Sequence, residues 1–225
     1  MKNPEEENSC VEAYLQACTD TVADRAVIDL LDQILYEPCF DTLRTREQLG
    51  YTVSSGMRLT HGVLGFAVLV MSGEHGPAHL DARMDAFLEA FAQQLASMSS
   101  EEFEKHRASL ISAKLQRDPT MAHESDRAWD AIATRRYDFN TRRDEVAHLR
   151  AIELAQVQQF YERHLRPNSP ARRKLSIHVV GRAHLEEMAA GAASGHQEVG
   201  CLDDFKAQSC CLYPARISML PVLDG

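Results

Sequence analysis

The chain has 225 residues, of which 44% are hydrophobic and 25% are charged, so it can bury a core as one large domain or two small ones. Its net charge of −9, from 33 acidic and 24 basic side chains, disfavours a general nucleic-acid binder, because such proteins usually carry a basic face. No N-terminal apolar run and no window of roughly 18 apolar residues is present, so we expect neither a secretory signal nor a membrane anchor.

The cysteines show neither a CxxC pair nor the regular spacing of a disulfide framework. There are six of them: Cys10, Cys18, Cys39, Cys201, Cys210 and Cys211. For a chain of this length, we expect reduced thiols and a cytoplasmic location, with an organellar compartment as the alternative.

The first half of the chain predicts one strand, one helix and then two further strands. In chain order, these are a strand at 11–18, a helix from 22 to 36 that Pro38 ends, and strands at 51–59 and 62–71. The short link at 60–62 requires the last two strands to pair antiparallel.

The second half predicts several helices followed by one strand. The helices are expected at 80–98, 100–117, 122–136, 141–150 and 153–164, and the strand at 174–180. Ser99 with Glu102 forms a capping-box pattern, and Trp129 is expected to be buried in packing. This order favours an α+β fold, a mostly antiparallel β-sheet packed against a layer of α-helices.

The composition suggests four segments. Residues 1–9 are interpreted as a disordered leader or linker, and 10–181 as the folded domain. Residues 182–200 are rich in small side chains and are interpreted as a flexible insertion, and 201–225 as a C-terminal tail partly packed on the domain.

No complete catalytic motif is present. The ten histidines form neither HExxH nor HxxEH, and the nearest approach, which begins at His184, has Met188 where the second histidine would stand. A thioether is a poor zinc ligand, so no metal site is expected. Phosphate-binding glycine loops and the GxSxG elbow are also missing from the sequence.

The segment FDTLRTREQLGY, residues 40–51, carries the strongest functional signal. It places Arg44 and Tyr51 seven residues apart across an expected helix-to-strand junction. Both side chains can hydrogen-bond a peptide carbonyl, and Arg44 does so with a rigid and permanently charged fork. The alternatives are that Arg44 is a surface residue paired with Glu47 or Asp41, and that Tyr51 is a core residue.

Several segments together resemble one known family. EPCFDTLRTREQLGYTVSSGMR, followed by GVLGFAVLVMSG, is similar to the last domain of the M16 metallopeptidases, in their insulin-degrading enzyme and nardilysin branch. Further matches occur in the same order: VEAYLQ, LDARMDAFLEAF, SSEEFEKHRASL, RAWDAIATRRYDF and SPARRKLSIHVVG. The resemblance covers nearly the whole chain, and its LRTREQLGY segment is the most specific part.

The resemblance implies a metallohydrolase domain of the M16 (LuxS-like) fold that lacks zinc. In this family, Zn²⁺ sits in an N-terminal domain that carries HxxEH, and the last domain contacts the peptide across a chamber. The residues that match those contacts are Arg44, Tyr51 and Phe40. The implied partners are a peptide substrate and the N-terminal M16 domains or another M16 chain, and the chain alone should be inactive.

Two other functions stay open on the sequence alone. The chain could serve as a zinc-free M16 scaffold or interaction subunit with no role in peptide cleavage. The basic run from Arg172 to Lys174 could instead bind a nucleotide or another anion, although a solvated turn is the simpler interpretation.

Overall fold

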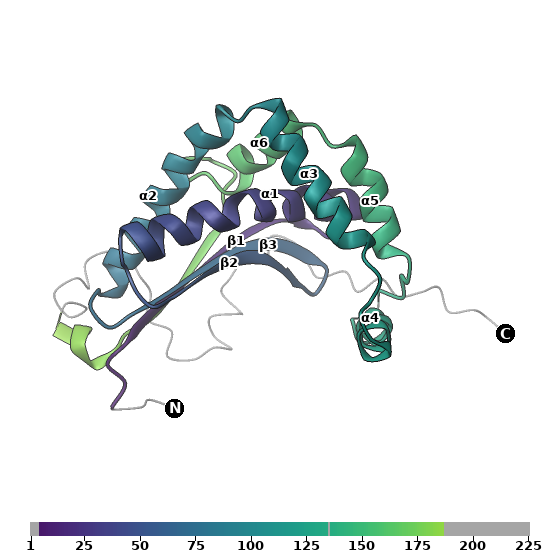
Figure 1. Ribbon diagram of the computed structural model, residues 1–225. Helices are drawn as coiled ribbons and strands as arrows, with labels where there is room; N and C mark the ends of the chain where they lie inside the picture. Colours follow the sequence, from purple (N-terminus) through teal and green to yellow (C-terminus); the bar gives the residue numbers. More distant parts are fainter. Residues whose placement is uncertain (1–4, 135, 187–225) are drawn as a thin grey trace.

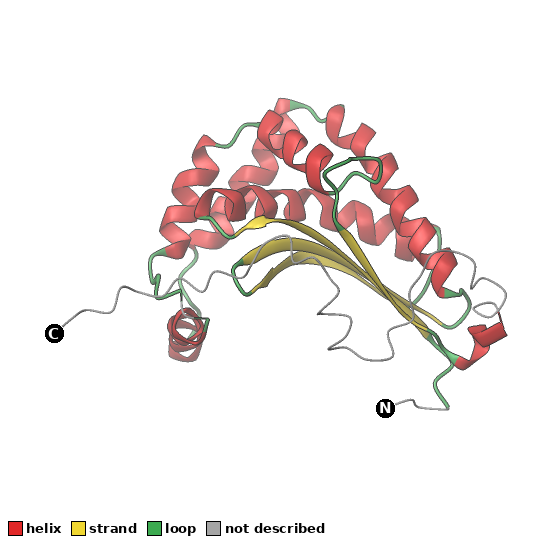
Figure 2. Ribbon diagram, turned by 180° about the vertical axis from the view of Figure 1, so that it is seen from behind, coloured by secondary structure: helices red, strands yellow, loops and turns green. Residues whose placement is uncertain are grey.

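The computed structural model describes residues 5–134 and 136–186. In this part of the chain, a curved four-stranded antiparallel sheet carries helices on its convex side, and no described element covers its concave side (Figure 1, Figure 2). The strands are β1 (Ser9–Thr19), β2 (Thr52–Thr60), β3 (Val63–Ser72) and β4 (Lys174–Val179), in the spatial order β2-β3-β1-β4. The expected α+β class and its single helical layer are confirmed.

The helices follow the predicted order closely. They are α1 (Val22–Phe40), α2 (Pro77–Ala96), α3 (Ser100–Leu115), α4 (Met121–Ala133), α5 (Thr141–Ala151) and α6 (Leu154–His164), with a π-helical turn η1 (Asp41–Arg46) and a 3₁₀ turn η2 (Arg182–His184). Ser99 caps α3 by accepting from the Glu102 backbone N–H at 3.2 Å, which is one of the two hydrogen bonds of the predicted capping box.

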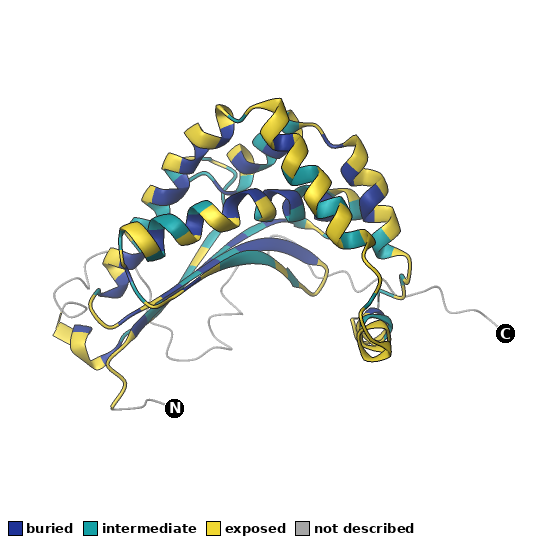
Figure 3. Ribbon diagram, viewed as in Figure 1, coloured by how far each residue is buried: buried dark blue, intermediate teal, exposed yellow. Residues whose placement is uncertain are grey.

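The core lies between the sheet and the helical layer (Figure 3). β1 alternates strictly, and its inward residues Val11, Ala13 and Leu15 are at most 1% exposed. From the other side, α1 contributes a buried stripe that includes Leu31 and Leu35. Burial of each such large side chain stabilises the fold by roughly 1.5–3 kcal/mol.

The β2–β3 hairpin confirms the predicted antiparallel pairing. Its two turn residues, His61 and Gly62, have φ values of 49° and 77°. Positive φ at both central positions is the signature of the type I′ turn, whose twist matches that of the flanking strands. The register then places Thr52 opposite Met71, at the far end of the hairpin.

Pro38 does not end α1, so that prediction is wrong. The helix runs on to Phe40 and continues directly into η1. Pro38 has no N–H, so the Ile34 carbonyl loses its usual donor four residues on. A proline interrupts a helix without ending it when the surrounding packing holds the chain, and here Leu35, Cys39 and Leu43 on either side are all buried.

Three more differences concern single segments. Trp129 is 66% exposed on α4, so the expectation that it is buried is wrong. Within the proposed leader, Glu6 accepts from the Arg182 backbone N–H at 2.8 Å and Ser9 already belongs to β1. Residues 187–200 of the proposed insertion and the whole 201–225 tail lie outside the described residues, so the segment boundaries stay a prediction.

A buried ionic network ties three helices together. On α1, Arg25 is 2.6 Å from Asp20 and 3.1 Å from Glu145 of α5. Lys114 of α3 lies 2.7 Å from the other Glu145 oxygen and also pairs with Asp29 of α1. The Glu145 side chain is only 5% exposed, so two cations share one carboxylate in a place where unpaired charge is costly.

We therefore expect Glu145→Ala to lower the free energy of unfolding by about 3 kcal/mol, because it leaves Arg25 and Lys114 under-compensated in the interior. Urea unfolding followed by circular dichroism measures this loss. The control is Glu101→Ala, which removes an exposed pair with Lys105 on α3 and should cost about 0.5 kcal/mol or less. Equal losses in the two variants would contradict the assignment.

Asp32 of α1 is a half-buried carboxylate with one buried, unpaired oxygen. Its Oδ1 atom has no hydrogen-bond partner among the described residues. Burial raises the pKa of Asp32 to about 6, against the opposing effect of a hydrogen bond from the Met57 backbone. Because the pKa is higher in the folded chain, the contribution of Asp32 is fully present below about pH 4 and is lost as the pH rises through about 6.

Asp32→Asn should consequently stabilise the chain at pH 8 by about 2 kcal/mol, less than the full shift implies because solvent screens part of the group. The gain should shrink through pH 6 and vanish near pH 4. Denaturant titrations at these three pH values test the prediction, and a gain of the same size at all three would refute it.

Candidate functional site

The segment between α1 and β2 is fixed by its own backbone and by two leucine anchors. Glu47 N–H donates to the Thr42 carbonyl at 2.9 Å, an i→i+5 bond of the π-helical type. Leu43 and Leu49 are 0% and 2% exposed and hold the turn in the core. Between them Gln48 adopts a φ of 52°, a left-handed conformation that reverses the chain toward β2.

Gly50 allows the next close approach. A Cβ atom at this position would lie 1.9 Å from the backbone oxygen of Met71, at the end of β3. This contact with β3 requires a residue without a side chain. Tyr51 follows directly and is therefore held at this end of the sheet, one residue before β2 begins.

Arg44 and Tyr51, which the sequence analysis proposed as substrate contacts, lie against each other. Arg44 Nε donates to the Tyr51 backbone oxygen at 3.1 Å, and the guanidinium carbon lies 5.2 Å from the centre of the Tyr51 ring. These two contacts orient the guanidinium. Its terminal nitrogens have no partner among residues 5–134 and 136–186, so their donors are free to bind a ligand.

The charged neighbours of Arg44 are already paired. Arg46 lies 2.7 Å from Asp41, and Glu47 receives two 2.7 Å hydrogen bonds from the fork of Arg83 on α2. The alternative in which Arg44 pairs with Asp41 or Glu47 is therefore wrong. The hydrogen bonds that Arg83 donates to the Glu47 carboxylate also raise the pKa of Arg83.

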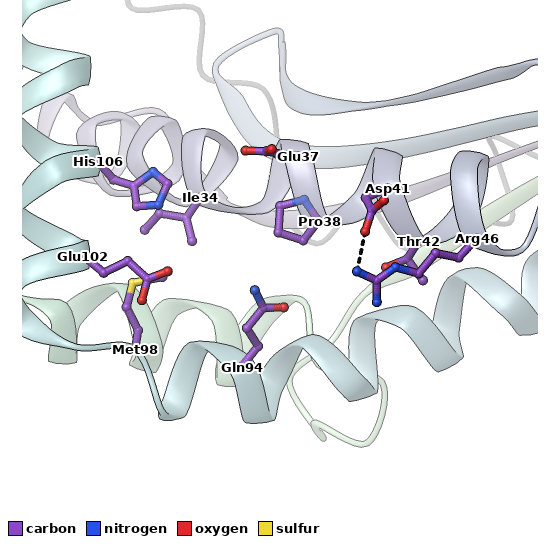
Figure 4. A pocket seen from close by; sticks show the side chains of 10 residues that line it. All are labelled: Ile34, Glu37, Pro38, Asp41, Thr42, Arg46, Gln94, Met98, Glu102 and His106. Atoms are coloured by element: carbon purple, nitrogen blue, oxygen red, sulfur yellow. Dashed lines mark ion pairs between the residues drawn. The ribbon is translucent and has the colours of Figure 1, made fainter.

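Figure 4 shows where Arg46 lies. It points into a groove of about 290 Å³ that α1 and η1 form with α2 and α3 on the helical side. Its lining also includes Glu37, Gln94 and Glu102. Arg44 does not line this groove, so η1 presents its two arginines on different sides.

The aromatic side chains of the site are open to solvent. Tyr51 is 88% exposed, and its phenol makes no hydrogen bond to any described residue, so Tyr51 is not a core tyrosine. Phe40 is 44% exposed at the end of α1, one turn before Arg44. The structure thus brings Arg44 and Tyr51 into direct contact, whereas no contact among the described residues joins Phe40 to either of them.

The basic run from Arg172 to Lys174 and the segment that begins at His184 both have structural roles. Arg172 lies 2.6 Å from Asp85 of α2, and Lys174 lies 2.8 Å from Asp81, so two cations of the basic run are neutralised and largely buried. His184 is buried, and its Nδ1 atom lies 2.9 Å from the Ser9 hydroxyl. Within the described ranges, no cluster of three histidine, cysteine or acidic side chains can hold a metal ion.

Sequence reasoning missed the supports of the site. Arg83 lies 36 residues from its partner Glu47, and nothing local in the sequence marks the pair. Leu43 and Leu49 were visible as apolar residues, but helical spacing alone does not identify the π-helical turn that buries both.

Comparison with known proteins identifies the family model that the chain matches and the fold that it shares with a solved structure. A family model described as "PQQ synthase PqqF-like, C-terminal lobe domain 4" matches residues 30–129. The structure of pitrilysin superimposes with a TM-score of 0.70 at 23% sequence identity, over 79% of this chain and 19% of that one. The fold is that of an M16 peptidase domain.

Sequence relatives agree with this assignment. A nardilysin-like protein of Arabidopsis thaliana is 38% identical over 80% of this chain and 18% of its own length. The insulin-degrading enzyme of Drosophila melanogaster is 32% identical over 98% of this chain and 23% of its own length. The chain belongs to the M16 peptidases as a C-terminal domain, and it spans about a fifth of the length of these relatives.

Gly50→Ala should destabilise the chain by about 2–3 kcal/mol, because the new Cβ collides with the Met71 carbonyl and the backbone must move. Amide hydrogen exchange at residues 48–53 should rise with it. Thermal unfolding and exchange measured by mass spectrometry test both effects.

The matched control is Gly56→Ala within β2. A Cβ atom there meets its nearest neighbour, Asp32 Oδ2, at 3.9 Å, an ordinary van der Waals distance. Gly56→Ala should leave exchange at residues 48–53 unchanged. If both alanine variants behave alike, the close approach at Gly50 does not fix this segment.

Proposed function

We propose that this chain holds the peptide substrate of an M16 peptidase through Arg44, Tyr51 and Phe40. The observation that carries the proposal is the Arg44 guanidinium, which is oriented by Tyr51 and left without an ion pair while its charged neighbours on the same turn are all paired. A rigid cation with free donors at the end of a sheet is suited to bind a peptide carbonyl or carboxylate.

The chemistry follows from these groups. Arg44 donors bind the carbonyl oxygen of the peptide bond that is cleaved, and they bind it more strongly as the oxygen gains negative charge in the tetrahedral transition state. The Tyr51 phenol supplies a second donor, and the exposed Phe40 ring packs against a substrate side chain. Arg44 and Tyr51 then stabilise the transition state at the carbonyl oxygen, while the attacking water is activated by another domain.

The concave face of the sheet supports a role in enclosing the peptide. Strand alternation sends Leu69 and Met71 of β3 to this face together with Leu175, Ile177 and Val179 of β4, and Val179 is 57% exposed. Neighbouring apolar side chains on a face that no described element covers favour contact with a ligand or with another domain. The proposed role in closing the proteolytic chamber rests on this face.

The remaining part of the active site is assigned to another M16 domain, in the same polypeptide or in a companion chain. That domain binds Zn²⁺ and supplies the attacking water. The chain alone should neither bind stoichiometric zinc nor cleave a peptide. No described helix is long and apolar enough to cross a membrane, and we propose a cytoplasmic location; one Arabidopsis relative is named as peroxisomal.

In the full-length peptidase that contains this chain, Arg44→Ala should lower kcat/KM by about 100-fold or more, because removal of one transition-state donor typically costs that much. Steady-state hydrolysis of a fluorogenic peptide measures the effect. The Arg44→Lys variant should have a kcat/KM only slightly higher than that of Arg44→Ala, since a lysine lacks the planar fork of arginine.

The matched control is Arg46→Ala, two residues away on the same turn. Its side chain points into the helical groove and is 74% exposed, so kcat/KM should stay within about threefold of the parent value. An Arg44→Ala enzyme with an unchanged kcat/KM would remove Arg44 from the mechanism.

A further inference from the structure

Helix α4 turns its apolar stripe to solvent. Met121, Trp129 and Ile132 recur at helical spacing and are 87%, 66% and 38% exposed. The α4 residue that is buried is Ala131, a small one on a different side of the helix. A surface helix of a globular protein normally turns its large apolar side chains toward the core. The opposite arrangement in α4 favours contact with a partner surface.

Contacts with the segment before it nevertheless brace the N-terminal end of the helix. Thr120 caps its N-terminus by accepting from the His123 backbone N–H, at 3.3 Å. Arg127 reaches back to Asp118 at 2.9 Å, which fixes the orientation of α4 about its own axis. The stripe is therefore presented by a preformed and oriented helix, the kind of element that loses little conformational entropy on binding.

Further exposed apolar side chains lie in the segments that precede and follow α4 in the chain. Leu115, at the end of α3, is 53% exposed, as are Tyr137 at 43% and Phe139 at 52% after α4. We call these six residues the α4 surface: Leu115, Met121, Trp129, Ile132, Tyr137 and Phe139. They make up six of the fourteen large hydrophobic side chains exposed in the described part of the chain, within 25 consecutive positions. Such a concentration marks an interaction site.

The position of α4 indicates which partner covers it. In Figure 1 and Figure 2, α4 stands apart from the helical layer and projects toward the concave, open side of the sheet. It therefore lies at the rim of the face that the proposed function assigns to the peptide chamber. A domain that closes over this face meets the rim.

We infer that the α4 surface docks against a second M16 domain, the one that faces the open side of the sheet. This inference rests on the proposed function. It is supported by the length of the relatives, of which this chain spans about a fifth, so their polypeptides contain further domains that such a surface can bind. Glu124 and Asp126 border the stripe, are exposed and make no ion pair with any described residue. The partner surface is accordingly apolar with a basic border.

The sequence contains a single tryptophan, so Trp129 is a reporter at the centre of the surface. The 225-residue chain, labelled with fluorotryptophan, is mixed with the Arabidopsis nardilysin-like protein lacking the segment that this chain matches. We expect a one-to-one complex in sedimentation velocity and a shifted Trp129 resonance in the fluorine NMR spectrum.

Substitution tests the surface directly. Trp129→Ser and Ile132→Ser should each weaken the complex by roughly 30-fold or more in titration calorimetry, as expected for central apolar anchors. Tyr36→Ser is the matched control, since Tyr36 is 57% exposed on α1, outside the α4 surface, and its loss should leave the affinity unchanged. All three side chains are exposed, so circular dichroism should report intact folding.

Several outcomes overturn the inference. If the complex forms but the Trp129 resonance stays in place and both serine variants bind normally, docking uses another surface and the proposed role of Arg44 is untouched. If the chain instead self-associates through Trp129, the surface is an interface between copies of this chain. If no complex forms, docking by α4 is rejected, whereas the Arg44 kinetics in the full-length peptidase still decide the proposed function.

Discussion

The packing of α1 on the convex face of the sheet is the contact on which the rest of this structure depends. Its buried stripe belongs to the core between the sheet and the helical layer and comes closest to β2, and its charged residues Arg25 and Asp29 connect it to α3 and α5. Because α1 continues into η1, the same packing also sets the direction in which Arg44 leaves the helix. The stability of the core and the geometry of the candidate site therefore both depend on how α1 packs.

The sequence predicted most of the architecture because its local signals agree with the tertiary fold. Alternation in β1, the short link between the two hairpin strands and the Ser99 cap each specify one local structure, and the order of elements then leaves few topologies. The candidate site was also partly predictable. Arg44 and Tyr51 could be identified from their chemistry and spacing, and the structure brings them into contact.

The wrong or missed predictions have physical causes that a local sequence pattern does not reveal. Pro38 stays inside a helix because tertiary packing on both sides outweighs its missing hydrogen bond. Trp129 lies on a helix with good amphipathic spacing, but spacing reveals a face and not what covers it. The Glu47–Arg83 pair joins segments far apart in sequence, so the reason that Arg44 is left unpaired could only be seen in three dimensions.

The π-helical turn sets a condition on the length of this segment as well as on its residues. A π turn contains about one residue more than an α turn, and each residue of a helix rotates the chain by roughly 100°. Loss of one residue between Thr42 and Glu47 would convert the turn to an ordinary α turn and swing Arg44 away from Tyr51 while α1 stayed in place. Variation in this region should therefore be confined to substitutions, because even a single insertion or deletion separates the guanidinium from the end of the sheet.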